Sequence, residues 1–469
     1  MQLPDLALAR RRTKEEVKRI DYKLDSKYKN IGKGKTYFVK TYGCQMNEHD
    51  SENIEGLLES VGFTKNNEME DADIIILNTC SIRENAHNKA FGMLGRIKHL
   101  KEKRKDLIVA LCGCMAQEEV VVNEILKKHK HVNFVFGTHN LYDLPRLISE
   151  STKKTNVCVY SMEGELVENL PVKRVNNFKA YVNIIYGCDK FCTYCIVPYT
   201  RGKQRSRKMK DILHEVNELK ELGYQEVTLL GQNVNAYGKD LDEGYDLSDL
   251  LVEVANTKIP RVRFITSHPW DFTDKMVEVI KNYPNIMPYV HLPLQSGSDR
   301  ILKLMGRRYT SEEYKTLFNK LKQIPNIAIT TDIIVGFPGE TEEDFNETLN
   351  MVNYCKYDSA FTFIYSPRVG TPAAKLYESD NTSLEVKEER LYKLNDLINS
   401  YSLANNQKYL GKIEKVLVEG LSSKEGEVFG YTETNKLVNF KGDSSLIGKI
   451  VNVKILDAKS FSLDGELVE

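Results

Sequence analysis

The sequence predicts a multidomain α/β protein. It has an N-terminal Rossmann-like parallel α/β domain, a central partial (β/α)6 barrel and a small C-terminal antiparallel β-barrel. Three observations predict this. Short apolar runs alternate with helical patterns over residues 35–153, six further strand–helix repeats lie in residues 174–404, and residues 405–469 carry strand patterns without helices. Strands that alternate with helices are typical of parallel sheets, whereas closely spaced short strands are typical of small barrels.

The composition is that of an average globular protein. The chain has 469 residues, 41% hydrophobic and 28% charged, with a formal net charge of zero. This balance neither requires nor excludes a polyanionic partner. No apolar run approaches the roughly 18 residues of a membrane span, and the N-terminus lacks a secretory signal. We therefore expect a cytoplasmic protein without membrane contact, whose nine cysteines bind metal or catalyse rather than form disulfides.

The N-terminal part begins with an extension, residues 1–34, which is rich in Lys, Arg and Glu and lacks a clean apolar period. We expect it to be helical in part at most. The domain of residues 35–153 follows, with helical patterns over 50–61 and 83–103. Its predicted strands cover residues 36–40, 73–77, 107–111 and 133–136. This alternation predicts a parallel sheet covered on both faces.

Three cysteines of this domain, Cys44, Cys80 and Cys114, each follow the end of a predicted strand. In an open α/β sheet the carboxyl ends of the strands share one edge, so these side chains can meet there. The alternative is that they are small core residues. Cys112 competes with Cys114, because the two would share a face if the strand continued. Cys158 and Cys355 have no partner by spacing and are interpreted as structural.

The central domain follows a predicted linker in the segments 151–156 and 163–177. Helical patterns cover residues 209–222, 311–323 and 342–354. Its predicted strands cover residues 180–186, 226–230, 261–266, 288–292, 327–335 and 360–364. A full TIM barrel has eight such repeats, so six predict a barrel that is not closed. Barrels of this kind carry their sites at the carboxyl ends of the strands.

The C-terminal domain is reached through a long helical pattern at residues 384–410. Its predicted strands cover residues 413–419, 428–432, 437–440, 450–456 and 460–467. Five strands without helices predict a small antiparallel barrel.

The clearest chemical motif is C-x-x-x-C-x-x-C, formed by Cys188, Cys192 and Cys195 directly after the first barrel strand. A tight loop can place three such thiolates on three corners of one [4Fe–4S] cube. A saturated cluster usually takes four cysteines, so one iron would stay open to a small molecule. Structural zinc needs a second C-x-x-C or a His pair at finger spacing, and the sequence has neither.

This motif and the six-repeat barrel resemble the radical S-adenosylmethionine superfamily. The resemblance implies that S-adenosylmethionine chelates the open iron and is cleaved to a 5′-deoxyadenosyl radical. Residues 41–47, 78–86 and 113–117 resemble the N-terminal domain of methylthiotransferases, and the last strands are similar to a TRAM domain, an RNA-binding barrel. In that family Cys44, Cys80 and Cys114 would hold a second [4Fe–4S] cluster that delivers sulfur. We favour Cys114 over Cys112 on this resemblance.

The nucleotide would be bound at the rim of the barrel. After the second strand the superfamily often places a Gly-Gly-Glu-type segment, whose acidic residue is absent here, so Gln232 or Asn233 would take its place. Further segments at the rim follow the fourth and fifth strands. The residues predicted to bind S-adenosylmethionine are Gly231, Gln232, Asn233, Gln295, Ser296, Ser298, Ile334 and Gly336.

An RNA partner is indicated by the segment 201–210, which holds six basic residues directly after the cluster loop. Such runs are typical of nucleic-acid contacts, although a solvated basic loop is the alternative. In the C-terminal barrel Phe429, Tyr431 and Phe440 either stack on bases or belong to the core. His268, within His268-Pro269-Trp270 at the rim, either contacts substrate or is structural.

The resemblance implies a methylthiotransferase that converts N(6)-dimethylallyladenosine beside the tRNA anticodon into its 2-methylthio derivative. The residues after Cys80 and those of 191–202 favour this substrate. The nearest alternatives are a sister enzyme acting on threonylcarbamoyladenosine in tRNA or on a ribosomal protein. A third alternative is a non-catalytic Fe–S carrier protein. We expect a monomer that binds the anticodon stem-loop; the sequence identifies neither the electron donor nor the sulfur donor.

Overall fold

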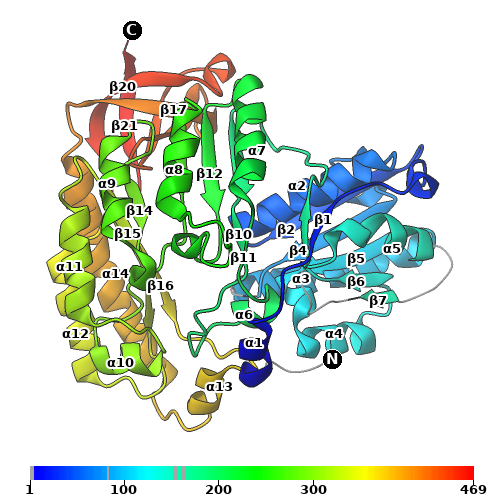
Figure 1. The fold of residues 1–469 in the computed structure, drawn as a ribbon, viewed down its shortest axis with the longest axis horizontal. Helices are drawn as coiled ribbons and strands as arrows, with labels where there is room; N and C mark the ends of the chain where they lie inside the picture. The colour runs from blue at the N-terminus through cyan, green and yellow to red at the C-terminus, as the bar shows by residue number, and fades with distance from the viewer. Residues whose placement is uncertain (1–4, 82–83, 152–156, 160–164, 469) are drawn as a thin grey trace.

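The computed structural model describes residues 5–81, 84–151, 157–159 and 165–468. Of the predicted features, Ile82, Arg83 and the linker residues 152–156 lie outside this range. Figure 1 shows the three predicted parts: the N-terminal domain on one side, the larger barrel on the other, and the small C-terminal barrel at one end of the larger one. Within the described residues no helix is long and apolar enough to cross a membrane.

The N-terminal domain is built on a six-stranded, all-parallel sheet in the order β3-β2-β4-β5-β6-β7. Its strands are β2 (Thr36–Tyr42), β3 (Thr64–Lys65), β4 (Ile74–Thr79), β5 (Ile108–Gly113), β6 (Phe134–Phe136) and β7 (Val157–Val159). The helices are α2 (Gln45–Ser60), α3 (Glu84–Lys103), α4 (Glu119–Lys128) and α5 (Leu144–Ser151). Two separate apolar cores, one on each face, confirm a sheet covered on both sides.

Helix α2 begins five residues before the apolar pattern predicts. Its first turns carry polar side chains, among them Asn47, Asp50 and Glu52, and these are buried rather than solvated. Buried polar groups are tolerated when they are hydrogen-bonded, and hydropathy alone does not reveal them. This part of α2 lies at the sheet edge where the three cysteines are placed.

The central domain confirms the predicted partial barrel of six parallel strands. They form two three-stranded sheets, β9-β12-β13 and β14-β15-β16, joined by the parallel bridge between Val262 and Ile286. The strands are β9 (Lys179–Asn183), β12 (Glu226–Leu230), β13 (Arg261–Phe264), β14 (Tyr289–His291), β15 (Ala328–Val335) and β16 (Ser359–Ile364). The predicted strand 180–186 is interrupted, because β10 (Ile185–Tyr186) pairs antiparallel with β11 (Arg205–Ser206).

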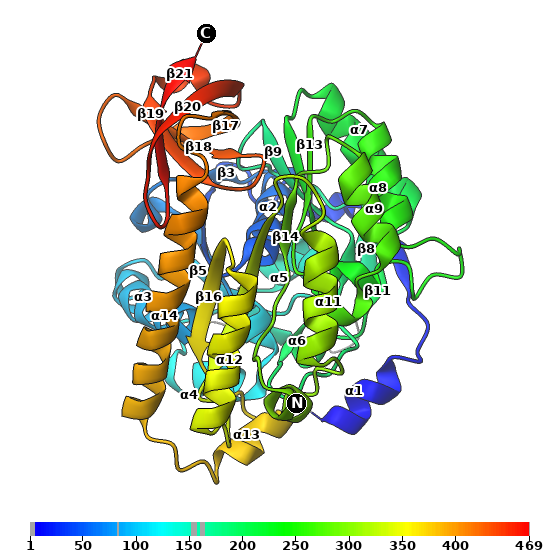
Figure 2. The ribbon, with the colours of Figure 1, turned by 90° about the vertical axis from the view of Figure 1, so that its left-hand side faces the viewer.

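Most helices of the central domain cover the outer side of the strands, and α14 leads directly into the C-terminal barrel (Figure 2). They are α7 (Met209–Glu221), α8 (Leu247–Asn256), α9 (Asp274–Asn282), α10 (Asp299–Leu304), α11 (Ser311–Leu321), α12 (Glu342–Cys355), α13 (Pro372–Tyr377) and α14 (Leu384–Gln407). The largest apolar core of the protein lies between these helices and the strands.

The C-terminal barrel is closed in the order β17-β18-β19-β21-β20. Its strands are β17 (Ile413–Leu421), β18 (Glu427–Thr432), β19 (Leu437–Lys441), β20 (Ile450–Ala458) and β21 (Leu463–Val468). The antiparallel prediction is wrong for one pair, because β21 returns parallel to β19. Phe440 is buried in the barrel core, so the core alternative holds for this residue, whereas Phe429 and Tyr431 are half-buried.

The small barrel is fixed to the amino ends of the large barrel's strands. Arg261, the first residue of β13, donates to the carbonyl oxygens of Tyr431 and Lys415 at 3.0 and 2.8 Å. Arg263 donates to those of Glu433 and Thr432 at 2.8 and 2.7 Å. The C-terminal barrel therefore lies at the end opposite to the carboxyl rim where the sites are expected.

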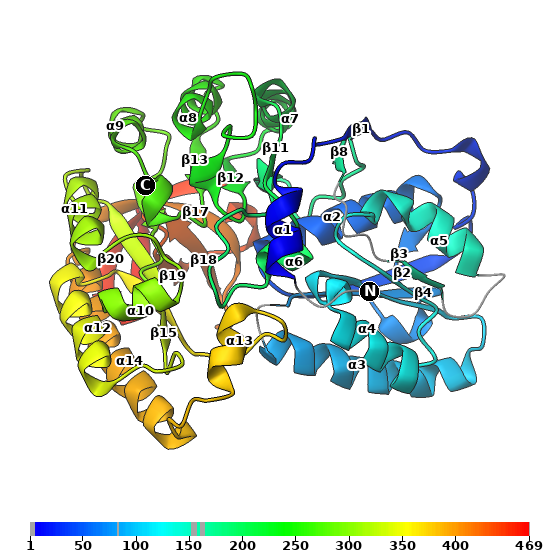
Figure 3. The same cartoon turned by 60° about the horizontal axis from the view of Figure 1, so that its bottom comes forward.

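The N-terminal extension is more ordered than its composition predicts. It contains helix α1 (Leu6–Arg12) and strand β1 (Arg19–Asp21), which pairs in parallel with β8 (Leu166–Glu168). Ala9 packs against Ile196, Tyr199 and Phe191 of the cluster loop. Figure 3 shows α1 beside α6 (Val197–Thr200), between the N-terminal domain and the barrel.

Candidate functional site

The loop that carries Cys188, Cys192 and Cys195 follows β10 at the carboxyl rim. It turns at Gly187, where φ is +69° and a Cβ atom would lie 2.0 Å from the Lys203 carbonyl oxygen, so only glycine fits. The Cys188 N–H donates to the Gly202 carbonyl oxygen at 3.2 Å, and the Cys195 N–H donates to that of Cys192 at 3.0 Å. These bonds fold the loop back on itself and bring the three thiols together.

The electrostatics of this triad fit a cationic cluster. Burial and repulsion from the neighbouring Cys192 together raise the pKa of Cys195 to about 12. Burial likewise raises the pKa of Cys188, with added repulsion from Cys195 and Cys192. Three thiolates in such a place repel one another until a metal compensates their charge. The chemistry of the donor set therefore suits a [4Fe–4S] cluster.

A single metal ion does not suit the same donors. The described part of the chain holds no group of three or more His, Cys, Asp or Glu side chains placed to bind one ion. A zinc ion needs its donors around one point, whereas a cube offers each thiolate an iron of its own.

Arg307 is a neighbour of this loop that the sequence did not indicate. It is 5% exposed, and its Nη1 approaches the Cys192 Sγ at 3.6 Å. Its Nη2 donates to the Pro293 carbonyl oxygen at 3.1 Å, which ties the cluster loop to the segment after β14. Arg307 and Arg308 are adjacent in the sequence, and no pattern around them predicts that the first is buried and the second exposed.

The second triad is assembled by the sheet. Strands β2, β4 and β5 are neighbours, with Tyr42 opposite Thr79 and Thr79 opposite Gly113. Cys44, Cys80 and Cys114 follow these positions by one or two residues, at the same edge. The pKa of the Cys44 thiol is lowered to about 6, chiefly by a contact with Cys80 and, against the effect of burial, also by Arg201 and the N–H groups of Asn47 and Met46.

Cys114 and Cys112 separate at Gly113. The strand ends there with φ at +94°, and a Cβ atom would lie 2.4 Å from the Thr79 carbonyl oxygen, so glycine is required. Cys114 then begins a 3-10 turn, whereas Cys112 packs in the apolar core on one face of the sheet. The strand ends between them, so strand alternation does not place Cys114, yet the two thiols stay close enough for Cys114 and Asp50 to help burial raise the pKa of Cys112. Cys355 is buried on α12, and Cys158 lies on β7.

Arg201 connects the two triads. It lies six residues after Cys195, and its Nε donates to the Cys114 Sγ at 3.0 Å. Its Nη2 forms an ion pair of 2.6 Å with Asp50, and both side chains are under 5% exposed. Burial raises the pKa of the Cys114 thiol, while the Arg201 charge opposes this. A fixed cation beside a sulfur donor stabilises the thiolate that a cluster requires.

The basic segment 201–210 is only partly a surface feature, and the expectation that the whole segment meets RNA is wrong. Arg201, Arg205 and Arg207 are 2%, 4% and 9% exposed. Arg205 donates to the Arg201 carbonyl oxygen at 2.9 Å, and Arg207 pairs with Glu168 at 2.8 Å and with Glu215 at 2.7 Å. Two of the carboxylates, Asp50 for Arg201 and Glu168 for Arg207, come from segments far along the chain, which a run of charges cannot reveal.

Asn233 carries an unpaired acceptor at the rim. Its Nδ2 donates to Asp271 at 2.6 Å, while its Oδ1 is buried without a hydrogen-bond partner. Buried acceptors are rarely left unpaired, so this oxygen suits a donor such as an amino group of a bound molecule. Gly231 packs tightly, since a Cβ atom there would meet Ile185 at 2.3 Å. Gln232 is half-buried beside them.

Asp271 is a site residue that the sequence did not indicate. Its side chain is fully buried and pairs with Lys190 of the cluster loop at 2.7 Å and with Lys239 at 2.6 Å. Although burial raises the pKa of this carboxyl group, bonds from Lys190, Lys239 and Asn233 outweigh it, and the pKa is lowered. The ionised carboxylate joins the cluster loop to the strand end that carries Asn233. No motif or spacing in the sequence predicts a role for Asp271.

The segment after β14 is held by α12. Gln295 adopts φ of +69°, and its carbonyl oxygen accepts from the Ile334 N–H at 2.9 Å. The hydroxyl of Ser296 lies 3.3 Å from that of Thr348, and the hydroxyl of Ser298 donates to Asp344 at 2.6 Å. Both serines therefore contact α12.

After β15 the chain turns at Gly336, whose φ is +65°. Its N–H donates to the carboxylate of Glu340 at 2.7 Å, and Arg390 pairs with the same carboxylate at 2.9 Å. Burial raises the pKa of Glu340 to about 7 despite these bonds. Ile334 and Tyr194 of the cluster loop pack against the same small apolar cluster. The predicted nucleotide segments therefore border the first triad.

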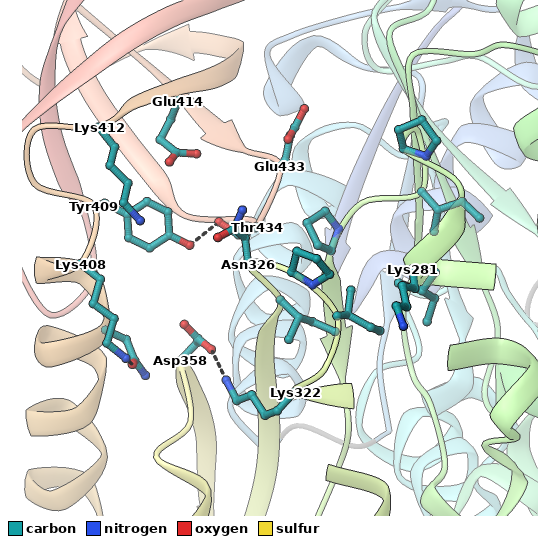
Figure 4. Close-up of a pocket in the computed structure, with 18 of the residues that line it drawn as sticks. Lys281, Lys322, Asn326, Asp358, Lys408, Tyr409, Lys412, Glu414, Glu433 and Thr434 are labelled. Carbon is teal, nitrogen blue, oxygen red and sulfur yellow. Dashed lines mark hydrogen bonds and ion pairs between the residues drawn. The ribbon is translucent and has the colours of Figure 1, made fainter. Parts of the chain in front are cut away.

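A pocket of about 390 Å³ lies elsewhere, between the amino ends of the barrel strands and the C-terminal barrel. Figure 4 shows its charged lining, which mixes Lys281, Lys322, Lys408 and Lys412 with Asp358, Glu414 and Glu433. Lys322 and Asp358 are 3.9 Å apart. None of the predicted site residues lines this pocket.

Comparison with known families identifies three segments. Residues 182–352 match the radical SAM superfamily, residues 36–137 match the uncharacterized protein family UPF0004, and residues 407–468 match the TRAM domain.

Curated relatives match over the whole chain. The tRNA-2-methylthio-N(6)-dimethylallyladenosine synthase of Staphylococcus saprophyticus is 54% identical over 100% of this chain and 92% of its own length. The enzyme of the same name from Bacillus cytotoxicus is 55% identical over 100% of this chain and 93% of its own length.

Among solved structures, the radical S-adenosylmethionine methyltransferase TsrM of Kitasatospora setae, with cobalamin and a [4Fe–4S] cluster bound, superposes with a TM-score of 0.53. It is 12% identical, over 72% of this chain and 77% of its own. A second structure of TsrM, with tryptophan and an analogue of S-adenosylmethionine, also has a TM-score of 0.53, at 13% identity over 70% and 72% of the two chains. These likenesses concern the fold alone.

Proposed function

The chain belongs to the tRNA-2-methylthio-N(6)-dimethylallyladenosine synthases of the radical S-adenosylmethionine superfamily, and from this premise we propose its activity. It converts N(6)-dimethylallyladenosine beside the tRNA anticodon into the 2-methylthio derivative, as a radical S-adenosylmethionine methylthiotransferase. The observation that carries this proposal is the identity of 54% to a curated synthase over the full length of the chain. Membership of the superfamily implies a [4Fe–4S] cluster and S-adenosylmethionine.

In this proposal Cys188, Cys192 and Cys195 hold the first cluster. When bound, it supplies the electron for the cleavage of S-adenosylmethionine. The hairpin of β10 and β11 holds the three thiols in one loop, and Arg307 offers a positive charge to Cys192. Cys192 is buried and Cys188 and Cys195 are partly buried, which limits the access of water to the thiolates.

The rim residues orient the nucleotide. The unpaired Oδ1 of Asn233 is the acceptor that the amino group of S-adenosylmethionine would use. Asp271 holds Asn233 in place through its Nδ2 and fixes Lys190 of the cluster loop at the same time. Gly231, Gln232, Gln295, Ile334 and Gly336 complete the proposed binding rim. Ser296 and Ser298 support it from their contacts with α12.

We further propose that Cys44, Cys80 and Cys114 hold a second [4Fe–4S] cluster, from which sulfur reaches the substrate. Three features of the chain support this: the strand ends place the thiols at one edge, Cys44 favours its thiolate form, and Arg201 donates to the Cys114 sulfur. The same arginine follows the first cluster loop by six residues, so one segment of the chain links the two sites.

The RNA partner in this proposal is the anticodon stem-loop of tRNA, bound by a monomer in the cytoplasm. An unpaired base can be splayed out of a loop into a pocket, as the chemistry at C2 of adenosine requires. The C-terminal barrel is anchored by Arg261 and Arg263 at the far end of the large barrel, so it would contact RNA away from the reacting base.

The test is a reaction of the anaerobically reconstituted protein with S-adenosylmethionine, a strong reductant and tRNA that carries dimethylallyladenosine. Mass spectrometry of the digested tRNA should show the 2-methylthio derivative, with 5′-deoxyadenosine released. A protein that modifies only threonylcarbamoyladenosine or a ribosomal protein contradicts the assignment. A protein that releases no 5′-deoxyadenosine contradicts the enzyme class.

A further inference from the structure

Trp270 is the only tryptophan of the chain, and it is 45% exposed. It belongs to the turn Pro269–Asp271, which follows β13 at the carboxyl rim of the barrel. Tryptophan has the largest aromatic surface of any side chain, and leaving it in water forgoes much of the stability that burial would give. At the rim, next to the first cluster loop, the exposed ring is placed where a bound molecule could cover it.

The turn that presents Trp270 is held from both sides. The Trp270 N–H donates to His268 Nδ1 at 3.3 Å, and the His268 ring stands edge-on to Tyr309 with centroids 6.0 Å apart. Burial lowers the pKa of His268 well below its ordinary value, which keeps the imidazole neutral as an acceptor. On the other side, Asp271 is fixed by Asn233 and Lys190. His268 is thus structural, and the indole ring is ordered before any ligand arrives.

Cations surround the ring. The Lys190 ammonium lies 5.2 Å from the Trp270 ring centroid and the Arg308 guanidinium lies 5.3 Å from it. Lys190 and Lys239 both pair with the adjoining Asp271, so this region holds three cations, counting Arg308, and one carboxylate. Arg308 is exposed, and Lys239 has 55% of its side chain in solvent. An exposed aromatic ring flanked by excess positive charge is the combination that single-stranded nucleic acids bind.

We propose that Trp270 is a stacking platform for an unpaired nucleotide of the RNA substrate, with Arg308, Lys190 and Lys239 facing its phosphates. The inference rests on the proposed function, since it assumes an RNA substrate. It adds a contact at the rim that the basic segment 201–210 does not provide, because three of its six cations are buried. Lys190 lies two residues after Cys188, so the stacked nucleotide is held beside the cluster loop.

The experiment uses the emission of the single tryptophan in the anaerobic holoenzyme. An anticodon stem-loop RNA is expected to change Trp270 emission in a saturable manner, with the same midpoint as RNA binding measured by filter retention. A fully paired RNA duplex of equal length is the control, and it should leave the emission unchanged because its bases are not free to stack. RNA binding without any change in emission, or an equal change with the duplex, overturns the inference.

Variants separate stacking from charge. Trp270→Ala should weaken stem-loop binding by roughly 5- to 150-fold, whereas Trp270→Phe keeps an aromatic face and most of the affinity. Tyr392→Ala on α14, at another exposed aromatic residue (66% exposed), is the matched control and should bind as the wild type does. Arg308→Gln should reduce the slope of log affinity against log salt concentration by about one.

Failure of this inference is distinguishable from failure of the proposed function. If the wild type methylthiolates tRNA while Trp270→Ala binds the stem-loop as tightly as the wild type, only the stacking platform is excluded. If the wild type neither binds the stem-loop nor modifies tRNA, the proposed function itself fails.

Discussion

The two cysteine triads of this protein are built in opposite ways. Cys188, Cys192 and Cys195 lie in one loop of eight residues, closed by its own backbone bonds to Gly202 and Cys192. Cys44, Cys80 and Cys114 come from three strand ends and meet only because β2, β4 and β5 are neighbours in a parallel sheet. The ligands of the first site are therefore close in sequence, whereas those of the second come together only when the whole domain is folded.

Their electrostatics differ as well. In the local triad, burial and mutual repulsion raise the pKa of Cys188 and Cys195. In the assembled triad the pKa of Cys44 is lowered to about 6, with Arg201 among the causes. The assembled site thus stabilises the thiolate of Cys44 with the protein's own groups, whereas at Cys114, Cys188 and Cys195 burial outweighs the groups that favour the thiolate and raises the thiol pKa.

The largest effect expected within the assembled site comes from its ligands. Cys114→Ala should remove the second cluster, with loss of methylthio product and about half of the bound iron. Cys112→Ala should keep both clusters and cost only about 1 kcal/mol of stability, because it removes one small group from the core. Iron and sulfide analysis of the two variants checks this; loss of the second cluster in Cys112→Ala but not in Cys114→Ala would reverse the ligand assignment.

A smaller effect should follow removal of the charge that joins the two sites. Arg201→Met leaves Asp50 buried without its 2.6 Å partner, and breaking a buried pair in this way costs about 3–5 kcal/mol. Chemical denaturation of the metal-free protein measures the change. Arg96→Met is the matched control, because its partner Glu70 is 47% exposed and the pair contributes at most about 1 kcal/mol. Equal stability of the two variants would show that Arg201 is not a structural link.

The smallest effect concerns the protonation of Cys44. Folding lowers the pKa of this thiol, so the stability it contributes is present above the unfolded pKa and is lost as pH falls through about 6. In the metal-free protein the alkylation rate of Cys44 should rise with a midpoint near pH 6, while Cys195, with its raised pKa, stays unreactive at neutral pH. Peptide mass spectrometry across a pH series checks this, and a Cys44 midpoint near the ordinary thiol value of about 8.5 would contradict it.

The comparison also explains what the sequence could predict. The six barrel strands carry clear apolar patterns, and the C-x-x-x-C-x-x-C spacing is local, so both can be read directly. The position of Cys114 could be predicted only as an alternative to Cys112, because the turn at Gly113 that separates them depends on its contact with Thr79. A strand pattern contains no information on where the strand ends to within one residue.

Charged residues account for most of what the sequence could not reveal. Arg201, Arg205 and Arg207 form a typical basic run, yet all three are buried by contacts with other segments. Arg201 pairs with Asp50, Arg205 contacts His139, and Arg207 pairs with Glu168 and Glu215. Asp271 shows no pattern at all, although it joins Asn233 to Lys190. Ion pairs between distant segments depend on tertiary packing, which hydropathy and spacing do not encode.

The central claim is that the chain holds two separate [4Fe–4S] sites, and the most direct test counts their atoms. Iron and acid-labile sulfide are measured in the reconstituted wild type and in a variant with Cys188, Cys192 and Cys195 all changed to Ala. We predict about eight irons per chain in the wild type and about four in the variant, since each cube carries four. A wild type with about four irons, or a variant with none, would contradict the account of two independent sites.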